Sequence, residues 1–341
     1  MTKTPDMRAG PQAGPAAEPP AVPQGGSSTA PGAGPVRALL ASDAAKGILF
    51  KLAATLAFTL MNVIVKALAA LPTGELVFAR AFFAIPPLVV VAWASGGLRR
   101  LVVTRRPLLH VRRSLTGTLA IFCYFVSLTA LPLVDATAIS FVMPIFSVVL
   151  AALVLKEQVG VWRWGAVVAG FLGVLLILAP HLGEGTGDAG APVALGAAAG
   201  LFGSFLAAFV VIFIRSMSTT ETSESIVFYF MATAAALSAL SFFFEFEMPT
   251  AAQAGLLVLC GVLGGLAQLA MTYSYRFAEP SLLAPFDYAA IVWATLLGIA
   301  IFAEVPTPIV CLGMLVIVAA GLTIAWRERH RHIERPKPPA L

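Results

Sequence analysis

Two charged residues lie deep inside long apolar runs and are the first candidates for chemistry. Arg80 lies about six residues inside a run that begins near residue 74, and Asp287 lies similarly deep in a run that begins near residue 281. The planar guanidinium of Arg80 suits a carboxylate or a phosphate of a ligand, unless the side chain snorkels to the headgroups. Asp287 could bind a cationic group or take up a proton. The alternative for Asp287 is a structural ion pair with Arg276 or Lys66.

Polar residues follow helical spacing within three other apolar runs. The stripes are Thr55, Thr59, Asn62 and Lys66; Thr137, Ser140, Pro144 and Ser147; and Gln268, Thr272 and Tyr275. Each set falls on one helix face, which hydrocarbon does not tolerate well. We therefore expect Asn62, Ser140 and Gln268 to line a polar cavity, although small hydroxyls can also bond back to their own helix. Pro144 removes a backbone hydrogen bond near mid-membrane and is a candidate hinge.

Other polar and aromatic residues have two readings each. Tyr288 and Trp293 form a stacking wall for a planar or aliphatic ligand, or simply pack. Lys66 and Arg215 are gate residues or anchors at the membrane interface. A carboxylate at a helix C-terminus opposes the helix dipole, so Glu157 and Glu304, which end their apolar runs, are expected to have a structural role and to accept hydrogen bonds from loop amides.

The elements that position these residues are membrane helices. The chain of 341 residues is 59% hydrophobic and 11% charged, with a mean hydropathy of +0.91, which is too apolar for a soluble globule. Runs of about 20 apolar residues predict membrane-spanning helices. We count ten runs: 47–68, 74–95, 112–131, 134–154, 162–180, 193–214, 225–245, 254–276, 281–302 and 307–326. The fold class predicted is therefore an all-α integral membrane protein.

The two halves of the chain repeat each other. A shift of 149 residues superposes polar residues of the first half on similar ones of the second: Gly47, Thr55, Lys66 and Glu75 fall on Gly196, Ser204, Arg215 and Glu224. Each half holds five spans, so the second copy crosses the membrane in the opposite sense. We expect two inverted five-helix repeats, residues 47–180 and 193–326, which is a typical arrangement of carriers.

Charge placement gives the orientation. The connection after the second span carries six arginines and no acid, and the C-terminal segment is also basic. Because Lys and Arg accumulate in cytoplasmic loops, both termini are expected in the cytoplasm. Residues 1–46, rich in proline, glycine and alanine, are predicted to be a disordered cytoplasmic tail, and residues 327–341 a basic cytoplasmic tail.

The segment Ala278 to Glu304, AEPSLLAPFDYAAIVWATLLGIAIFAE, and its counterpart Leu131 to Glu157, LPLVDATAISFVMPIFSVVLAALVLKE, resemble the ninth and fourth helices of the drug/metabolite transporter (DMT) superfamily. The resemblance covers about residues 47 to 326 and is to the ten-helix branch with two EamA domains. The phrase FARAFFAIPPL, Phe78 to Leu88, resembles the riboflavin and S-adenosylmethionine carriers of that superfamily.

These observations predict a secondary active transporter of the inner membrane. Its cargo is expected to be a small polar or zwitterionic metabolite: amino-acid-like, riboflavin-like or S-adenosylmethionine-like. A coupling proton and the lipid bilayer are its other partners, whereas no nucleic acid, cofactor or metal is expected, since P-loop, HExxH and GxSxG motifs are absent from the sequence. A lipid or lipid-headgroup flippase on the same fold is the alternative, and an intramembrane enzyme is a remote one.

Overall fold

The computed structural model describes residues 43–94, 97–153, 160–182, 190–217, 220–278 and 280–334, and within these ranges the regular structure is helical. The helices are α2 (Asp43–Ala67), α3 (Thr73–Phe82), α4 (Ile85–Ala94), α5 (Arg99–Val102), α6 (Pro107–Ala130), α7 (Leu133–Ser140), α8 (Met143–Leu153), α9 (Val161–Leu182), α10 (Gly190–Met217), α11 (Ser223–Ala239), η1 (Leu240–Phe243), α12 (Ala251–Phe277), α13 (Pro280–Asp287), α14 (Ala289–Phe302) and α15 (Pro308–Glu334).

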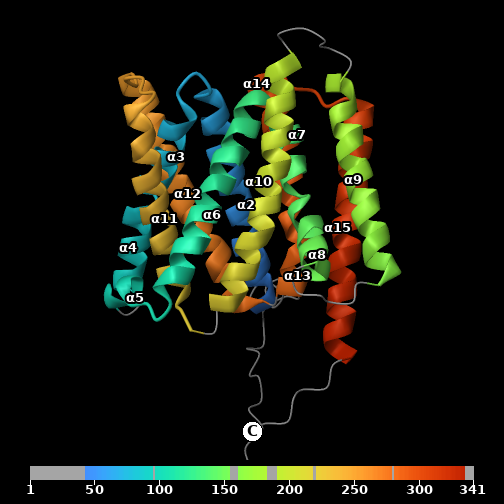
Figure 1. The fold of residues 1–341 in the computed structure, drawn as a ribbon, viewed down its shortest axis with the longest axis horizontal. Coiled ribbons are helices and arrows are strands. Elements are labelled where there is room, and N and C mark those ends of the chain that lie inside the picture. Colours follow the sequence, from blue (N-terminus) through green and yellow to red (C-terminus); the bar gives the residue numbers. More distant parts are fainter. Residues whose placement is uncertain are drawn as a thin grey trace, which may run out of the picture. The chain divides into compact units, whose positions relative to one another are not determined.

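These helices make ten passes across the bundle (Figure 1). Nine candidate spans in the described residues are long and apolar enough to cross a membrane, and the shorter apolar helix Trp164–Pro180 lies in the one remaining pass, the fifth, which is α9. The second, fourth and ninth passes are each built from two helices, α3 and α4, α7 and α8, and α13 and α14. Helices suit this setting because their backbone groups bond to one another where no water is available.

The two repeats are inverted. Five passes separate the start of α2 from the start of α10, so α10 begins at the opposite end of the bundle (Figure 1). We call the end at which α2 begins the near end, which is the lower end in Figure 1, and the other the far end. The protein is thus a ten-helix integral membrane protein with two inverted five-helix repeats.

Packing between the repeats follows the same symmetry. The main partners are α2 with α12, α10 with α6, α3 with α11, and α9 with α15. The helices α2 and α12 are the first and eighth passes, and α6 and α10 are the third and sixth. Replacing each pass by its counterpart in the other repeat therefore converts the first pair into the second. It leaves the pairs α3 with α11 and α9 with α15 unchanged. An approximate twofold relation in the membrane plane produces this pattern.

Two predicted boundaries are wrong by part of a helix. Residues 43–46, assigned to the N-terminal tail, are the first turn of α2, and α15 runs on to Glu334, through more than half of the predicted basic tail. The charged and polar residues of these segments are compatible with helix, so the loss of apolar character does not mark a helix end. Residues 1–42 and 335–341 lie outside the described residues.

Candidate functional site

Three passes are interrupted close to predicted site residues. The break between α3 and α4 comes three residues after Arg80, and the break between α7 and α8 follows Ser140 directly. The third break, at Tyr288, follows Asp287 directly. Prolines explain the first two breaks, because Pro86, Pro87 and Pro144 supply no N–H for the preceding turn. Broken helices at membrane depth are typical of binding sites in carriers.

Asp287 forms an ion pair near the near end of the bundle. Its Oδ1 lies 2.6 Å from Nζ of Lys51 on α2, and Lys51 also donates to the hydroxyl of Tyr275 at 3.0 Å. The Lys51 side chain is 1% exposed, whereas that of Asp287 is 39% exposed. The carboxylate thus neutralises a buried cation while part of it stays accessible.

The ion pair corrects the expected partner of Asp287. Sequence reasoning offered Arg276 or Lys66, but Lys51 takes this place, and the side chain of Arg276 lies outside the described residues. Lys51 could have been found, because it lies four residues before Thr55 and extends the polar stripe of α2 by one turn.

A second ion pair joins α2 to the ninth pass at the far end. Nζ of Lys66 lies 2.9 Å from Oε1 of Glu304 and donates to the carbonyl of Leu131 at 2.6 Å. The other Glu304 oxygen accepts the backbone N–H of Leu133 at 2.7 Å. Glu304 therefore fastens the start of α7 to the end of α14. Glu157 and the side chain of Arg215, which the repeat relates to Glu304 and Lys66, lie outside the described residues.

Arg80 is buried and does not extend towards the headgroups. It is 8% exposed, and its Nε has no hydrogen-bond partner among the described residues. The side chain passes beside Gly264 on α12, where an added Cβ would lie 3.6 Å from its Cγ. Even lenient scales assign a mid-helix charge in a membrane a cost of about 2.5 to 3.5 kcal/mol. An arginine kept in this setting without a carboxylate is a candidate for ligand binding.

Asn62 extends the polar region across α2 and α6. Its Nδ2 donates to the Tyr124 hydroxyl at 2.8 Å, whereas its Oδ1 is buried without a partner in the described part of the chain. Tyr124 in turn lies close enough to Arg80 to interact electrostatically. Sequence reasoning did not single out Tyr124. A buried acceptor without a partner, such as Oδ1 of Asn62, can accept a hydrogen bond from a polar ligand.

Most hydroxyls of the predicted stripes bond to their own helices. Ser140 donates to the carbonyl of Thr137 at 2.6 Å, and the same kind of bond is made by Thr55, Thr59, Thr137, Ser147 and Thr272. Such bonds satisfy the hydroxyl without a ligand. Gln268 is only partly buried on α12.

The two aromatic residues of the ninth pass that the sequence singled out, Tyr288 and Trp293, are differently placed. The Tyr288 ring lies 5.0 Å from that of Phe141, and its hydroxyl lies where a Cβ on Gly321 would collide with it. Tyr288 thus packs between α15 and Phe141, which lies in the break between α7 and α8. Nε1 of Trp293 is buried, and within the described ranges it has no hydrogen-bond partner, so the indole retains a donor for a ligand.

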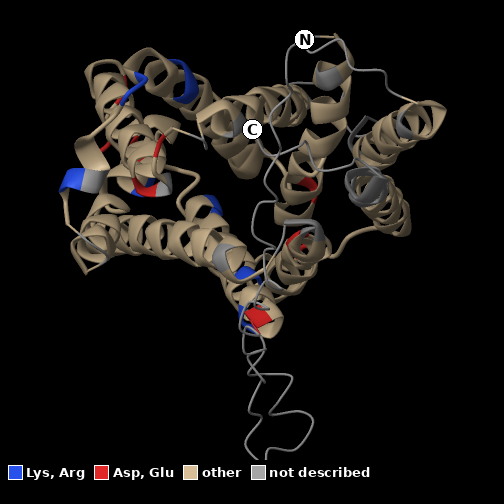
Figure 2. Cartoon of the chain, turned by 90° about the horizontal axis from the view of Figure 1, so that it is seen from below, with Lys and Arg blue, Asp and Glu red and all other residues tan. Residues whose placement is uncertain are grey.

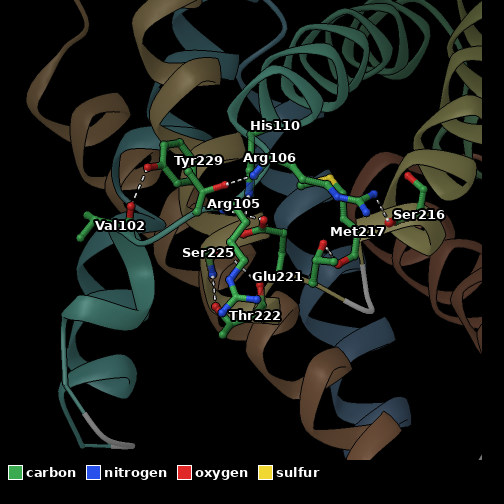
Figure 3. A network of polar contacts seen from close by, with 12 residues as sticks. Val102, Arg105, Arg106, His110, Ser216, Met217, Glu221, Thr222, Ser225 and Tyr229 are labelled. Atoms are coloured by element: carbon green, nitrogen blue, oxygen red, sulfur yellow. Dashed lines mark hydrogen bonds and ion pairs between the residues drawn. The ribbon is translucent and has the colours of Figure 1, made fainter.

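A polar network closes the near end between the repeats (Figure 3). Glu221, after α10, accepts the backbone N–H of Arg105 at 2.9 Å, and its other oxygen lies 3.4 Å from Nε2 of His110. The Tyr229 hydroxyl donates to the Val102 carbonyl at 2.8 Å. Burial raises the pKa of Glu221, but the hydrogen bonds from Arg105 and His110 outweigh it and leave the pKa below its ordinary value. No pattern in the sequence had pointed to this network.

Charged side chains are otherwise sparse along the helices, as the view from the near end shows (Figure 2). Within the described ranges, no three His, Cys, Asp or Glu side chains gather as metal ligands would.

Comparison with known proteins agrees with this arrangement. Residues 45–179 and 194–326 each match the EamA-like transporter family. The chain is 30% identical to the pseudopaline exporter CntI of Pseudomonas aeruginosa over 83% of its length and 97% of that protein. It is 29% identical to a riboflavin transporter of Rhizobium johnstonii, covering 85% of this chain and 94% of the relative.

Two further matches have lower identity. An S-adenosylmethionine uptake transporter of Rickettsia prowazekii is 27% identical over 75% of this chain and 83% of its own length. A solved crystal structure superposes with a TM-score of 0.58 at 21% identity, over 84% of this chain and 99% of that one. This structure supports the fold alone.

Proposed function

Since the chain belongs to the EamA-like transporter family, we propose that it is a secondary active carrier that moves a small polar or zwitterionic metabolite by alternating access. Its relatives are named for pseudopaline, riboflavin and S-adenosylmethionine. The cargo proposed here is of that general kind, amino-acid-like, riboflavin-like or S-adenosylmethionine-like. The inverted repeats supply two bundles that can exchange conformations and open a central site to either side.

One observation carries the proposal. Three of the candidate binding residues present buried polar atoms without partners among the described residues: Oδ1 of Asn62, Nε of Arg80 and Nε1 of Trp293. Buried polar groups in proteins are nearly always hydrogen-bonded, so several orphans in an apolar bundle favour a site that a polar ligand completes.

The remaining roles follow from position. Ser140 and Gln268 line the site, Tyr288 and Trp293 form its wall, and the break at Pro144 is a hinge. Lys66 and Arg215 act at opposite ends of the bundle as gate or interface residues. Glu157 and Glu304 are structural and hold the ends of their passes.

Asp287 is the proposed coupling residue. Its carboxylate is partly exposed, and the groups that face it are Lys51 of α2 and, through that lysine, Tyr275 of α12. Protonation of Asp287 would remove the counter-charge of Lys51 and so favour a different arrangement of α2 and α13. This links proton uptake to movement of the two repeats.

The near end is proposed to face the cytoplasm, with both termini on that side of the inner membrane. The arginine-rich connection between α4 and α6 lies there, in agreement with the positive-inside tendency. Residues 47–180 and 193–326 are the two transport repeats, between a disordered N-terminal tail and a basic C-terminal segment.

The test is transport by the full chain reconstituted in sealed vesicles. A metabolite panel is first screened by thermal shift, and hits are then assayed as labelled solutes with and without an imposed pH gradient. Accumulation of unaltered solute supports the carrier, and its loss in Asp287→Asn with the gradient present supports coupling. Movement of labelled lipid between leaflets with no solute transport would favour the flippase, and a chemically altered solute would favour an enzyme.

A further inference from the structure

A second buried arginine lies on α6, which packs against the α3 helix of Arg80. Arg113 comes six residues after the start of α6, roughly 9 Å from the near end at 1.5 Å per residue. It is 5% exposed, and its Cζ lies 3.8 Å from the centroid of the Phe230 ring on α11. Sequence reasoning had counted Arg113 among the loop arginines that set the orientation, but it belongs to the interior.

The donors of this arginine are unused. Nε and Nη1 of Arg113 are buried without a partner in the described residues, as is Nε of Arg80, and Oγ of the neighbouring Ser114 is also unpartnered. The Phe230 ring covers the face of the Arg113 guanidinium, and this contact leaves the N–H groups along its edge free to donate. Nε and Nη1 point in different directions within the guanidinium plane, so each can donate to an oxygen of a carboxylate or phosphate.

The helices that carry the two arginines, α3 and α6, pack against each other, and Ala81, next to Arg80, lies in the same apolar cluster as Phe230, whose ring covers Arg113. Two glycines make room for the arginines. A Cβ on Gly117 would lie 2.9 Å from the Phe230 ring and 3.5 Å from Nη1 of Arg113, and a Cβ on Gly264 would crowd Met61 and approach Arg80. Two like charges held together in a low-dielectric interior call for an anion between them.

We infer that Arg80 and Arg113 together bind a dianionic group of the transported metabolite, either a phosphate or a pair of neighbouring carboxylates. This inference rests on the proposed carrier function and narrows its substrate class. One negative charge would leave a net positive site, whereas two neutralise both guanidiniums. Neutral and cationic metabolites gain nothing from this pair of residues.

The phosphate of an anionic lipid shares this chemistry, so the test must separate the two sources. Purified full-length protein in neutral detergent is titrated with inorganic phosphate, with succinate and with uncharged dimethyl succinate, at matched ionic strength. A parallel series adds phosphatidic acid. Binding is measured by calorimetry and by the shift in melting temperature.

We expect succinate or phosphate to bind and raise the melting temperature, and dimethyl succinate to do neither. Arg80→Gln and Arg113→Gln should each weaken binding roughly thirtyfold or more, because each removes one partner of a buried charge pair. Arg112→Gln is the matched control, since this neighbouring side chain is exposed, and binding should be unchanged. If a glutamine variant does not fold, Arg113→Lys, which keeps the charge but loses the fork, should still weaken binding.

Equal binding of dianions to the variants and the parent would overturn the inference. Stabilisation by phosphatidic acid alone would also overturn it, in favour of a lipid headgroup. If vesicles transport a neutral or cationic metabolite and no dianion binds, the carrier function stands and the substrate class is wrong. If dianions bind but no solute is transported, the proposed function fails while the anion site remains.

Discussion

Two ion-paired lysines and two buried arginines of this bundle differ in whether a carboxylate lies beside them. Lys51 and Lys66 of α2 each lie within 3 Å of a carboxylate of the ninth pass. Arg80 and Arg113 have no carboxylate partner in the described part of the chain. A charge that the fold already neutralises needs no ligand, whereas an unneutralised one is costly until a ligand arrives. In the proposed function, this difference distinguishes residues that hold the helices together from the proposed cargo-binding residues.

The largest effect is expected from breaking the ion pair of the more deeply buried lysine, Lys51, which is 1% exposed. Asp287→Asn leaves Lys51 without a counter-charge and should lower the free energy of unfolding by about 3 kcal/mol. This is the low end for buried pairs, because the carboxylate is partly exposed. Thermal unfolding of the purified protein measures it. Adding Lys51→Met should restore most of the loss, and an unchanged melting temperature in Asp287→Asn would contradict a stabilising pair.

Replacing an unpaired arginine by a neutral residue should raise the free energy of unfolding, in contrast to breaking an ion pair. Arg80→Met removes a buried charge without breaking an ion pair, so the ligand-free protein should become more stable by about 1 to 3 kcal/mol. Arg113→Met should gain less, because it also loses the contact with the Phe230 ring. Melting temperatures without added anions test this, and destabilisation by Arg80→Met would show that the distinction between lysines and arginines is false.

Lys66, the cation of the far-end ion pair, is less buried than Lys51, so this pair should contribute less to stability. The side chains of Lys66 and Glu304 are 13% and 21% exposed. Glu304→Gln keeps an acceptor for the Leu133 amide but removes the charge, so we expect a loss of about 1 to 2 kcal/mol. The matched comparison is Asp287→Asn under the same conditions. A larger loss for Glu304→Gln would reverse the order inferred from burial.

The smallest effect concerns Glu221, outside the spans, and depends on pH. Its pKa lies below the ordinary value of 4.5. A carboxylate with a lowered pKa stabilises the folded state above the ordinary pKa, and the contribution disappears as the pH falls through the lower value. Glu221→Gln should therefore lower the melting temperature at pH 7 and have a smaller effect below about pH 4. An equal effect at both pH values would exclude a charge-based role.

The fold was largely predictable, because each membrane-spanning helix requires an apolar run of matching length in the sequence, and few other structures can cross a bilayer. The candidate site was predictable only in part. Arg80 and Asp287 stand out as charges within apolar runs, and the break at Pro144 follows from a missing N–H. Lys51 could be recognised as part of the polar stripe of α2, but its pairing with Asp287 could not be derived, because it depends on the packing of α2 against α13.

Arg113 shows a different limit. A cluster of arginines next to a span indicates a cytoplasmic loop, and the first turns of α6 continue that cluster without a change in composition. Only the packing of α6 against α11 reveals that Arg112 is exposed while Arg113 is buried. Local patterns identify the class of a residue, but tertiary packing decides its environment.

The ion pairs of Lys51 and Lys66 restrict how α2 can move. The two lysines are 15 residues apart, so their ion pairs fasten α2 to the ninth pass at two points roughly 22 Å apart along the helix. A helix held at two points cannot rotate relative to the ninth pass unless one of the two ion pairs breaks. A rocking motion that keeps both ion pairs must therefore move α2 and the ninth pass together as one rigid unit. The helix contacts that change during the motion must then lie elsewhere in the bundle.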